Sequence, residues 1–161
     1  MKLLILILTI IIIIIYSICY YIFPTDISIF QTDIEKFDLT LLSSRQPIVI
    51  SDYLQNPEEI INSWFKYNII NYDFNNDEFK NNDWKHNNHK YLFMNAYEDT
   101  EIIIYKAQIT KINPTTEDKI IVIKLKKNQS LILPFKWKYY ASNINIWNID
   151  DIITFSFGKV F

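Results

Sequence analysis

Two histidines, His86 and His89, are the side chains with the clearest capacity for metal chemistry in this chain of 161 residues. Imidazoles three residues apart share one face of a helix and can bind the same ion. The segment from 81 to 88 is rich in asparagine, which predicts a loop, and no cysteine or further histidine completes a zinc site. We therefore interpret both as exposed loop histidines. The sequence predicts no metal site, and these two residues are its only metal candidates.

Two pairs of adjacent carboxylates, Glu58-Glu59 and Asp150-Asp151, contain the residue types of an acid and its partner base. Neighbouring side chains point apart, so we interpret neither pair in this way. The first pair follows Asn56-Pro57, which predicts a helix start with Asn as N-cap and Pro at the first helical position. For the second pair we expect a solvated turn. No G-x-S-x-G context orients a serine nucleophile, and the sequence predicts no catalytic residue.

Composition excludes several kinds of binding site. Residues 24–161 contain 15 basic and 18 acidic residues, a net charge of about −3, which argues against electrostatic binding of nucleic acid. Gly158 is the only glycine, so a glycine-rich phosphate loop is excluded, and turns that need left-handed backbone must use asparagine. The alternation of aromatic residues and lysines from Phe135 to Tyr140 predicts a strand with the rings inside and Lys136 and Lys138 in water.

Leu3 to Phe23 is a run of 21 uncharged residues dominated by Leu and Ile. As a helix with a rise of about 1.5 Å per residue, it would extend over roughly 31 Å, against a bilayer core of roughly 30 Å. We therefore predict a transmembrane helix that ends at Pro24 and holds the chain in a membrane as a single-pass protein. Lys2 precedes the run and acidic residues follow it, which favours a cytoplasmic N-terminus. A signal peptide cleaved near Cys19 is the alternative.

Beyond that helix, the apolar pattern is mainly that of strands. Residues 47–51 form a short apolar run, followed by the helix that begins at Pro57 and extends to about Tyr67. From residue 91 onward, short alternating segments are separated by turn residues, as in a sandwich or barrel. We therefore expect a linker with a short helix over 24–44 and one mainly β domain over 45–161. Its later strands are predicted at 101–109, 119–127, 130–134, 137–142 and 151–157.

The segment Leu125–Tyr139 resembles the late signature of cupin-like proteins of the JmjC type. In that signature an apolar strand leads to a proline, a tryptophan and a metal-binding histidine, and Pro134 and Trp137 match this order. The opening is similar too, because Arg45–Ser51 precedes a helix as the family's first strand does. The resemblance covers about residues 45–161 and implies a double-stranded β-helix, a compact jelly-roll barrel.

The resemblance also implies an iron site of two histidines and one carboxylate, with open positions for oxygen and a 2-oxo acid. Here Tyr139 stands at the position of the late histidine, and no H-x-D or H-x-E triplet is present. We therefore predict a barrel that has lost its metal and has no cofactor. It would be a membrane-held binding or structural module for a protein partner. The abundance of Ile, Asn, Lys, Tyr and Phe is the bias that an AT-rich genome imposes, which suggests a virus with such a genome. The alternative is a divergent membrane-bound, iron- and 2-oxo-acid-dependent oxygenase that uses His86, His89 and a carboxylate.

Overall fold

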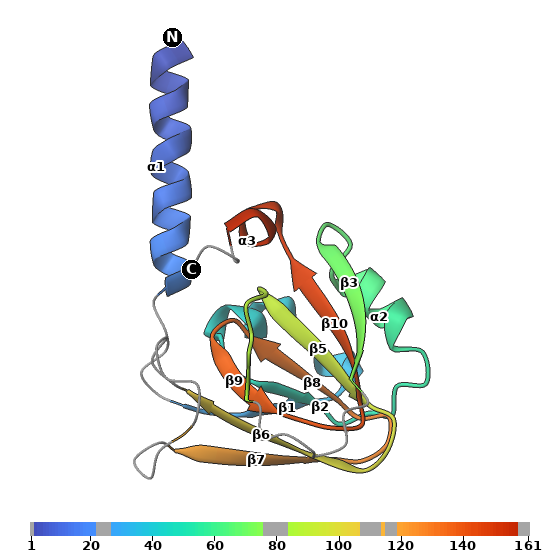
Figure 1. Cartoon of the computed structure of the whole chain (residues 1–161). Coiled ribbons are helices and arrows are strands. Elements are labelled where there is room, and N and C mark those ends of the chain that lie inside the picture. The colour runs from blue at the N-terminus through green and yellow to red at the C-terminus, as the bar shows by residue number, and fades with distance from the viewer. Residues whose placement is uncertain (1, 22–26, 76–83, 107–113, 115–118, 158–161) are drawn as a thin grey trace.

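The computed structural model describes residues 2–21, 27–75, 84–106, 114 and 119–157. Its strands form two sheets with few helices, and this mainly β architecture agrees with the prediction (Figure 1). The helical segments are α1 (Lys2–Tyr21), the 3-10 helices η1 (Ile34–Lys36) and η2 (Leu39–Ser44), α2 (Pro57–Trp64) and α3 (Ile152–Phe157). The strands are β1 (Phe30–Thr32), β2 (Ile48–Ile50), β3 (Ile69–Asn75), β4 (Lys85–His86), β5 (Tyr91–Ala96), β6 (Thr100–Lys106), β7 (Ile120–Leu125), β8 (Ser130–Pro134), β9 (Trp137–Tyr140) and β10 (Ile144–Asp150).

The N-terminal helix α1 is present and extends away from the sheets (Figure 1), but the prediction that it crosses a membrane is wrong. Within the part of the chain that the structure describes, no helix has both the length and the apolar character of a membrane span. Phe23, the predicted end of the span, lies outside the described residues.

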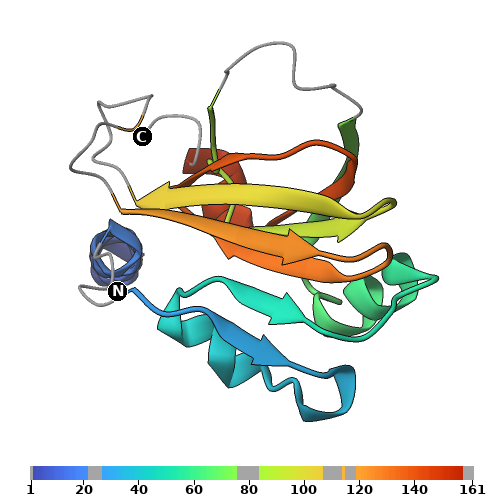
Figure 2. The same ribbon diagram turned by 90° about the horizontal axis from the view of Figure 1, so that it is seen from below.

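The strands are divided between two sheets. The larger sheet has the order β1-β2-β8-β5-β10-β3, and the smaller sheet has the order β4-β9-β6-β7. Neighbouring strands are antiparallel except β1 and β2, which are parallel. Seen from below, β6 and β7 lie side by side and α1 appears end-on (Figure 2). From β3 to β10 the chain changes sheet at every step except the one from β6 to β7.

Two apolar cores lie on opposite faces of the larger sheet. Along β10, Ile144 and Ile146 point into the core between the two sheets, whereas Trp147 and Ile149 belong to the core on the other face. The second core is covered by α2, through Ile61. Because both faces of the larger sheet are covered along β8, this strand is buried at every position, and its sequence is a nearly continuous apolar run rather than an alternation. The core between the sheets consists of Leu92, Met94, Ala96, Ile102, Ile104, Ile123, Leu125, Leu131, Leu133, Trp137, Tyr139, Ile144 and Ile146.

The predicted helix start is confirmed at α2. Asn56 occupies the N-cap position, Pro57 is the first helical residue, and Glu58 and Glu59 lie in the first turn. The Asn56 side chain makes no capping hydrogen bond. The amide of Asn56 is therefore not used to stabilise the helix.

Asparagine does supply left-handed backbone, as predicted, although not alone. Among the described residues, φ is positive at Asn128 (67°) and Asn143 (56°), and also at Arg45 (55°) and Lys136 (69°). The last two carry the steric cost of a Cβ atom in this region of φ. Both lie in tight turns, where Arg45 ends η2 and Lys136 joins β8 to β9.

The strand predicted at 151–157 is wrong, because β10 ends at Asp150 and α3 begins at Ile152. The backbone N–H of Thr154 donates to Oδ1 of Asp151 (2.7 Å), and the N–H of Asp151 donates to Oγ1 of Thr154 (2.9 Å). This reciprocal pair is a capping box with threonine in place of the usual glutamate. It starts a helix in a segment whose apolar residues also fit a strand.

Candidate functional site

His86 lies in β4 rather than in a loop, opposite Lys138 of β9. Its Nδ1 atom is 2.6 Å from Oδ1 of Asn88. Burial lowers the pKa of His86; the hydrogen bond to Asn88 opposes this shift, and the positive charge of Lys138 adds to it. The His86 imidazole is therefore neutral at pH 7, and one of its nitrogens already has a partner.

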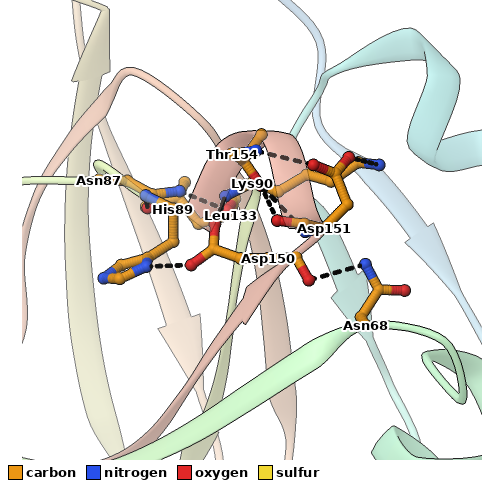
Figure 3. Close-up of polar contacts among 8 residues, drawn as sticks. All are labelled: Asn68, Asn87, His89, Lys90, Leu133, Asp150, Asp151 and Thr154. Carbon is orange, nitrogen blue, oxygen red and sulfur yellow. Dashed lines mark hydrogen bonds and ion pairs between the residues drawn. The ribbon is translucent and has the colours of Figure 1, made fainter. Parts of the chain in front are cut away.

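His89 forms a short contact with Asp150, which is 61 residues away in the sequence: Nδ1 of His89 lies 2.6 Å from Oδ2 of Asp150. The other oxygen, Oδ1, accepts the backbone N–H of Lys90 (2.9 Å). Asp150 is only 2% exposed, so the expectation of a solvated turn is wrong for this residue. Figure 3 shows its carboxylate between the His89 ring and the Lys90 backbone. These side chains and their neighbours are called the Asp150 network: Asn68, Asn87, His89, Lys90, Asp150, Asp151 and Thr154.

Asn87 fixes the loop that presents His89. Its side chain is buried, and Nδ2 donates to the carbonyl oxygens of Leu133 (2.9 Å) and Pro134 (2.7 Å) at the end of β8. Its Oδ1 accepts the backbone N–H of His89 (2.8 Å). The loop between β4 and β5 is thereby tied to β8 (Figure 3). His89 is held in place from two sides, by this loop and by Asp150.

The Asp150 network orients the imidazole of His89, but its other polar side chains form ion pairs and hydrogen bonds within the fold. An ionised carboxylate only accepts, so Nδ1 of His89 is the donor in the contact with Asp150. The Lys90 ammonium pairs with Asp151 (2.8 Å), and the Thr154 hydroxyl belongs to the cap of α3. Across the described residues, no group of three His, Cys, Asp or Glu side chains is placed to hold a metal ion. The network therefore braces the junction of β10 and α3.

Tyr139, at the position of the family's late histidine, points into the core between the sheets. It lies opposite Ile104 of β6 and is 6% exposed, and burial raises the pKa of its hydroxyl, with a further contribution from Asp73. Trp137 is fully buried in the same core, as predicted, and Pro134 ends β8 opposite Tyr91.

The two lysines of this segment are not in water, which corrects the prediction. Lys136 is 9% exposed and Lys138 is 2% exposed, and burial lowers the pKa of both ammonium groups. Lys136 lies in the tight turn after β8. Lys138 lies on the outer face of β9 between His86 and the buried ring of Tyr105, so its stem is covered by neighbouring strands.

A polar cleft opens where the first turn of α2 meets the larger sheet. The strand register aligns Ser130 of β8, Asn95 of β5 and Asn145 of β10 in one row across the sheet, and the next row contains Trp147 and Tyr72. The cleft has a volume of about 510 Å³, within the range of roughly 300–1,000 Å³ typical of ligand pockets. We call it the α2 cleft. Its lining residues are Gln55, Asn56, Pro57, Glu58, Glu59, Tyr72, Asn95, Tyr97, Asn128, Asn145 and Trp147.

Hydrogen bonds fix the side chains on the floor of the α2 cleft. Nδ2 of Asn95 donates to the carbonyl oxygen of Asn128 (3.2 Å) and to Oγ of Ser130 (3.0 Å). The hydroxyl of Tyr72 donates to Oδ1 of Asn145 (3.0 Å). The Tyr72 ring, which is 55% exposed, lies 5.2 Å from the ring of Trp147. An aromatic surface therefore lies beside fixed amides in a cleft with two carboxylates in its lining.

A second cavity, of about 560 Å³, lies at the ends of β6 and β7, and most of its described charged side chains contact other groups of the fold. Lys124 pairs with Glu101 (3.1 Å), and Oδ1 of Asp99 accepts the backbone N–H of Lys127 (2.8 Å). The hydroxyl of Thr100 donates to the carbonyl oxygen of Ser142 (2.9 Å). The α2 cleft is the better candidate for binding, because the carboxylates of Glu58 and Glu59 in its lining form no ion pair with a described residue. Oδ1 of Asn95 on its floor likewise accepts no hydrogen bond from the described part of the chain.

Sequence reasoning found one part of the α2 cleft and missed the rest. Glu58 and Glu59 were recognised as charges at a helix start, and the structure places them there. Asn95, Asn145 and Tyr72 come together only through the register of β3, β5 and β10. The available signal was an asparagine between apolar residues in both β5 and β10. Comparison of the chain with protein-family models, curated proteins and solved structures found no match.

Proposed function

We propose that this chain is a non-catalytic binding module with a cupin-like, double-stranded β-helix fold, and that it binds its partner in the α2 cleft. The strand order supports the fold. The strands β3, β10, β5 and β8 form one four-stranded block and β4, β9, β6 and β7 the other, with the chain passing between them. Two facing sheets joined in this way are the arrangement of a jelly roll.

The packing between the sheets carries the proposal. In an oxygenase of the cupin-like type, the interior of the barrel holds the metal and the reacting groups. Here that interior contains buried Trp137, Tyr139, Met94 and Ile104, with apolar neighbours from both sheets. Tyr139 contributes a ring whose hydroxyl stays protonated, because burial raises its pKa. A filled apolar interior favours binding on the outside of the larger sheet, where the α2 cleft lies.

The oxygenase alternative rests on His86, His89 and a carboxylate, and among the described residues one such pair, His89 and Asp150, is in contact. The carboxylate of Asp150 faces Nδ1 of His89 and also accepts the N–H of Lys90. This carboxylate is engaged by two protein donors and is nearly inaccessible to solvent. Those contacts support a bracing role for the pair.

Two measurements on the full chain test the proposal. The first is the iron content of the purified protein together with turnover of 2-oxoglutarate. The second is a titration with short basic, acidic and neutral peptides and a neutral oligosaccharide, followed by NMR of the asparagine side-chain amides. We expect no stoichiometric iron, and we expect at least one probe to shift the signals of Asn95 and Asn145. Stoichiometric iron lost in the variant with His86→Ala and His89→Ala, or the absence of any shift with every probe, would refute the proposal.

A further inference from the structure

From the hydrogen-bonding groups of the α2 cleft, we infer that its ligand is the guanidinium group of an arginine in a basic segment of a protein partner. The inference rests on the proposed binding function and names the chemistry of the ligand. It depends on three features of the cleft: the polarity of the fixed groups on its floor, the charge of its lining, and its exposed aromatic ring.

Asn95, the least exposed residue in the lining of the cleft, offers a ligand an acceptor. Both donor contacts of the Asn95 amide, to Asn128 and Ser130, are made by Nδ2. The contact with a backbone carbonyl fixes that atom as the nitrogen, because a carbonyl oxygen only accepts. Oδ1 of Asn95 accepts nothing from the described residues. Asn95 is 3% exposed, yet no described side-chain nitrogen or oxygen is both fully buried and without a partner, so this oxygen reaches the solvent of the cleft.

Other groups of the cleft continue this bias toward acceptors. The hydroxyl hydrogen of Tyr72 is donated to Asn145, so the Tyr72 oxygen offers lone pairs to a ligand. The carboxylates of Glu58 and Glu59 also only accept. Nδ2 of Asn145 is the donor among these fixed groups, and the amides of Gln55, Asn56 and Asn128 in the lining can donate as well as accept. A ligand that satisfies the acceptors on the floor and the two carboxylates must carry several donors close together, and its backbone carbonyls suit the amides.

The charge of the cleft selects among donor-rich ligands. The described residues that line it include two glutamates and no lysine, arginine or histidine. Phosphates and acidic peptides would meet uncompensated carboxylates, which disfavours them. Sugar hydroxyls are neutral and would leave the two glutamates without an opposite charge. A cation with several donors satisfies both the acceptors and the charge.

The exposed ring of Tyr72 distinguishes guanidinium from a simple ammonium ion. A guanidinium is planar, carries five N–H donors in a fixed geometry, and stacks on aromatic faces. The Tyr72 ring is held by its contact with Trp147 and by the hydrogen bond to Asn145, so it is a pre-formed stacking surface. The volume of about 510 Å³ accommodates one long side chain with its flanking backbone.

The test uses full-length protein and a short capped peptide, Ac-Gly-Arg-Arg-Gly-amide, in isothermal titration calorimetry and NMR. The matched ligand replaces both arginines with citrulline, which keeps the shape and removes the charge. We expect the arginine peptide to shift the side-chain signals of Asn95 and Asn145 and the citrulline peptide to bind at least 10-fold more weakly. Binding should also weaken as salt concentration rises.

Substitutions in the cleft and outside it test whether the arginine peptide binds in the α2 cleft. Replacing Glu58 and Glu59 with glutamine should weaken binding by about 2- to 30-fold, since each exposed ion pair is worth roughly 0.2–1 kcal/mol. The control with Glu35→Gln and Glu101→Gln removes the same net charge outside the cleft lining and should leave the affinity unchanged within about 2-fold. Tyr72→Ala should weaken binding by about 2- to 30-fold through the lost stacking.

The results of these titrations distinguish a wrong ligand class from the absence of binding in the α2 cleft. Equal affinity for the arginine and citrulline peptides, or shifts of Asn95 and Asn145 produced only by cellotetraose or by Ac-Gly-Glu-Glu-Gly-amide, would overturn the inference while the binding function stands. If none of the four probes shifts the side-chain signals of Asn95 and Asn145, both the ligand inference and the proposed binding function are wrong. Loss of arginine-peptide binding that is equal in the two double variants would also contradict the inference, because net charge rather than the cleft would then govern binding.

Discussion

Replacing Asp150 with alanine should be among the most damaging single changes outside the apolar cores. Its carboxylate accepts from Nδ1 of His89 (2.6 Å) and from the backbone N–H of Lys90 (2.9 Å), and the residue is 2% exposed. A hydrogen bond to a charged acceptor contributes about 1.5–3 kcal/mol, and a buried donor left without a partner is costly in itself. Because the His89 side chain is 31% exposed, water replaces part of its contact. We therefore expect the free energy of unfolding to fall by roughly 2–4 kcal/mol.

The asparagine variant separates the two contacts of Asp150. In Asp150→Asn, Oδ1 of the amide still accepts from Lys90, and the amide nitrogen donates to His89 once the ring adopts its other neutral tautomer. The expected loss is only about 1 kcal/mol, the difference between charged and neutral hydrogen bonds. Asp150→Ala should therefore be clearly less stable than Asp150→Asn.

Urea unfolding at neutral pH, followed by tryptophan fluorescence, measures these differences as shifts of the midpoint at constant slope. Asp33→Ala is the matched control. Asp33 pairs with Lys36 (3.2 Å) at the surface, and the two side chains are 44% and 78% exposed, so its loss should cost about 0–1 kcal/mol. If Asp150→Ala loses no more stability than Asp33→Ala, the bracing role assigned to the Asp150 network is wrong.

Two further predictions concern Tyr139 and His86. Tyr139→Phe should change the free energy of unfolding by less than about 1 kcal/mol, whereas Tyr139→Ala should lower it by about 3–5 kcal/mol because it opens a cavity between the sheets. Urea unfolding measures both values, and similar losses in the two variants would contradict a packing role for the ring. Burial holds the pKa of His86 below the ordinary value of 6.5, so the unfolded chain binds the proton more readily, and the stability that neutral His86 supplies is lost as the pH falls below about 6.5. His86→Gln should therefore show a smaller fall of the urea midpoint between about pH 7.5 and pH 5 than the parent chain, and an equal fall would count against this reading.

Local signals predicted the elements that depend on neighbours in sequence. The apolar run at β2 and the Asn-Pro start of α2 were recognised because a short buried strand and a helix cap are each specified within a few residues. The same kind of reasoning failed at 151–157. There the apolar residues fit a strand and a helix equally well, and the capping box of Asp151 and Thr154 decided the outcome.

Contacts between segments that are distant in the chain could not be predicted from the sequence. His89 and Asp150 were both noted, but their pairing depends on the position of the loop after β4 beside the end of β10. The row of Ser130, Asn95 and Asn145 depends on the register of three strands that are not consecutive in the chain. Each of these residues looks like an ordinary polar residue in its own segment. Pairing register is set by packing of whole faces, and a single sequence does not specify it.

The existence of the α2 cleft follows from a short helix on a wide sheet. With 8 residues, α2 is about 12 Å long, whereas a sheet of six strands spaced by about 4.8 Å is roughly 24 Å wide. The helix covers the apolar row of Ile132, Phe93 and Trp147, and it begins beside the polar row that contains Asn95. Covering that row with apolar residues would leave Oδ1 of Asn95 buried without a donor, at a cost of about 1–3 kcal/mol. The sheet is therefore left open where its polar groups need water or a ligand with donors to satisfy them.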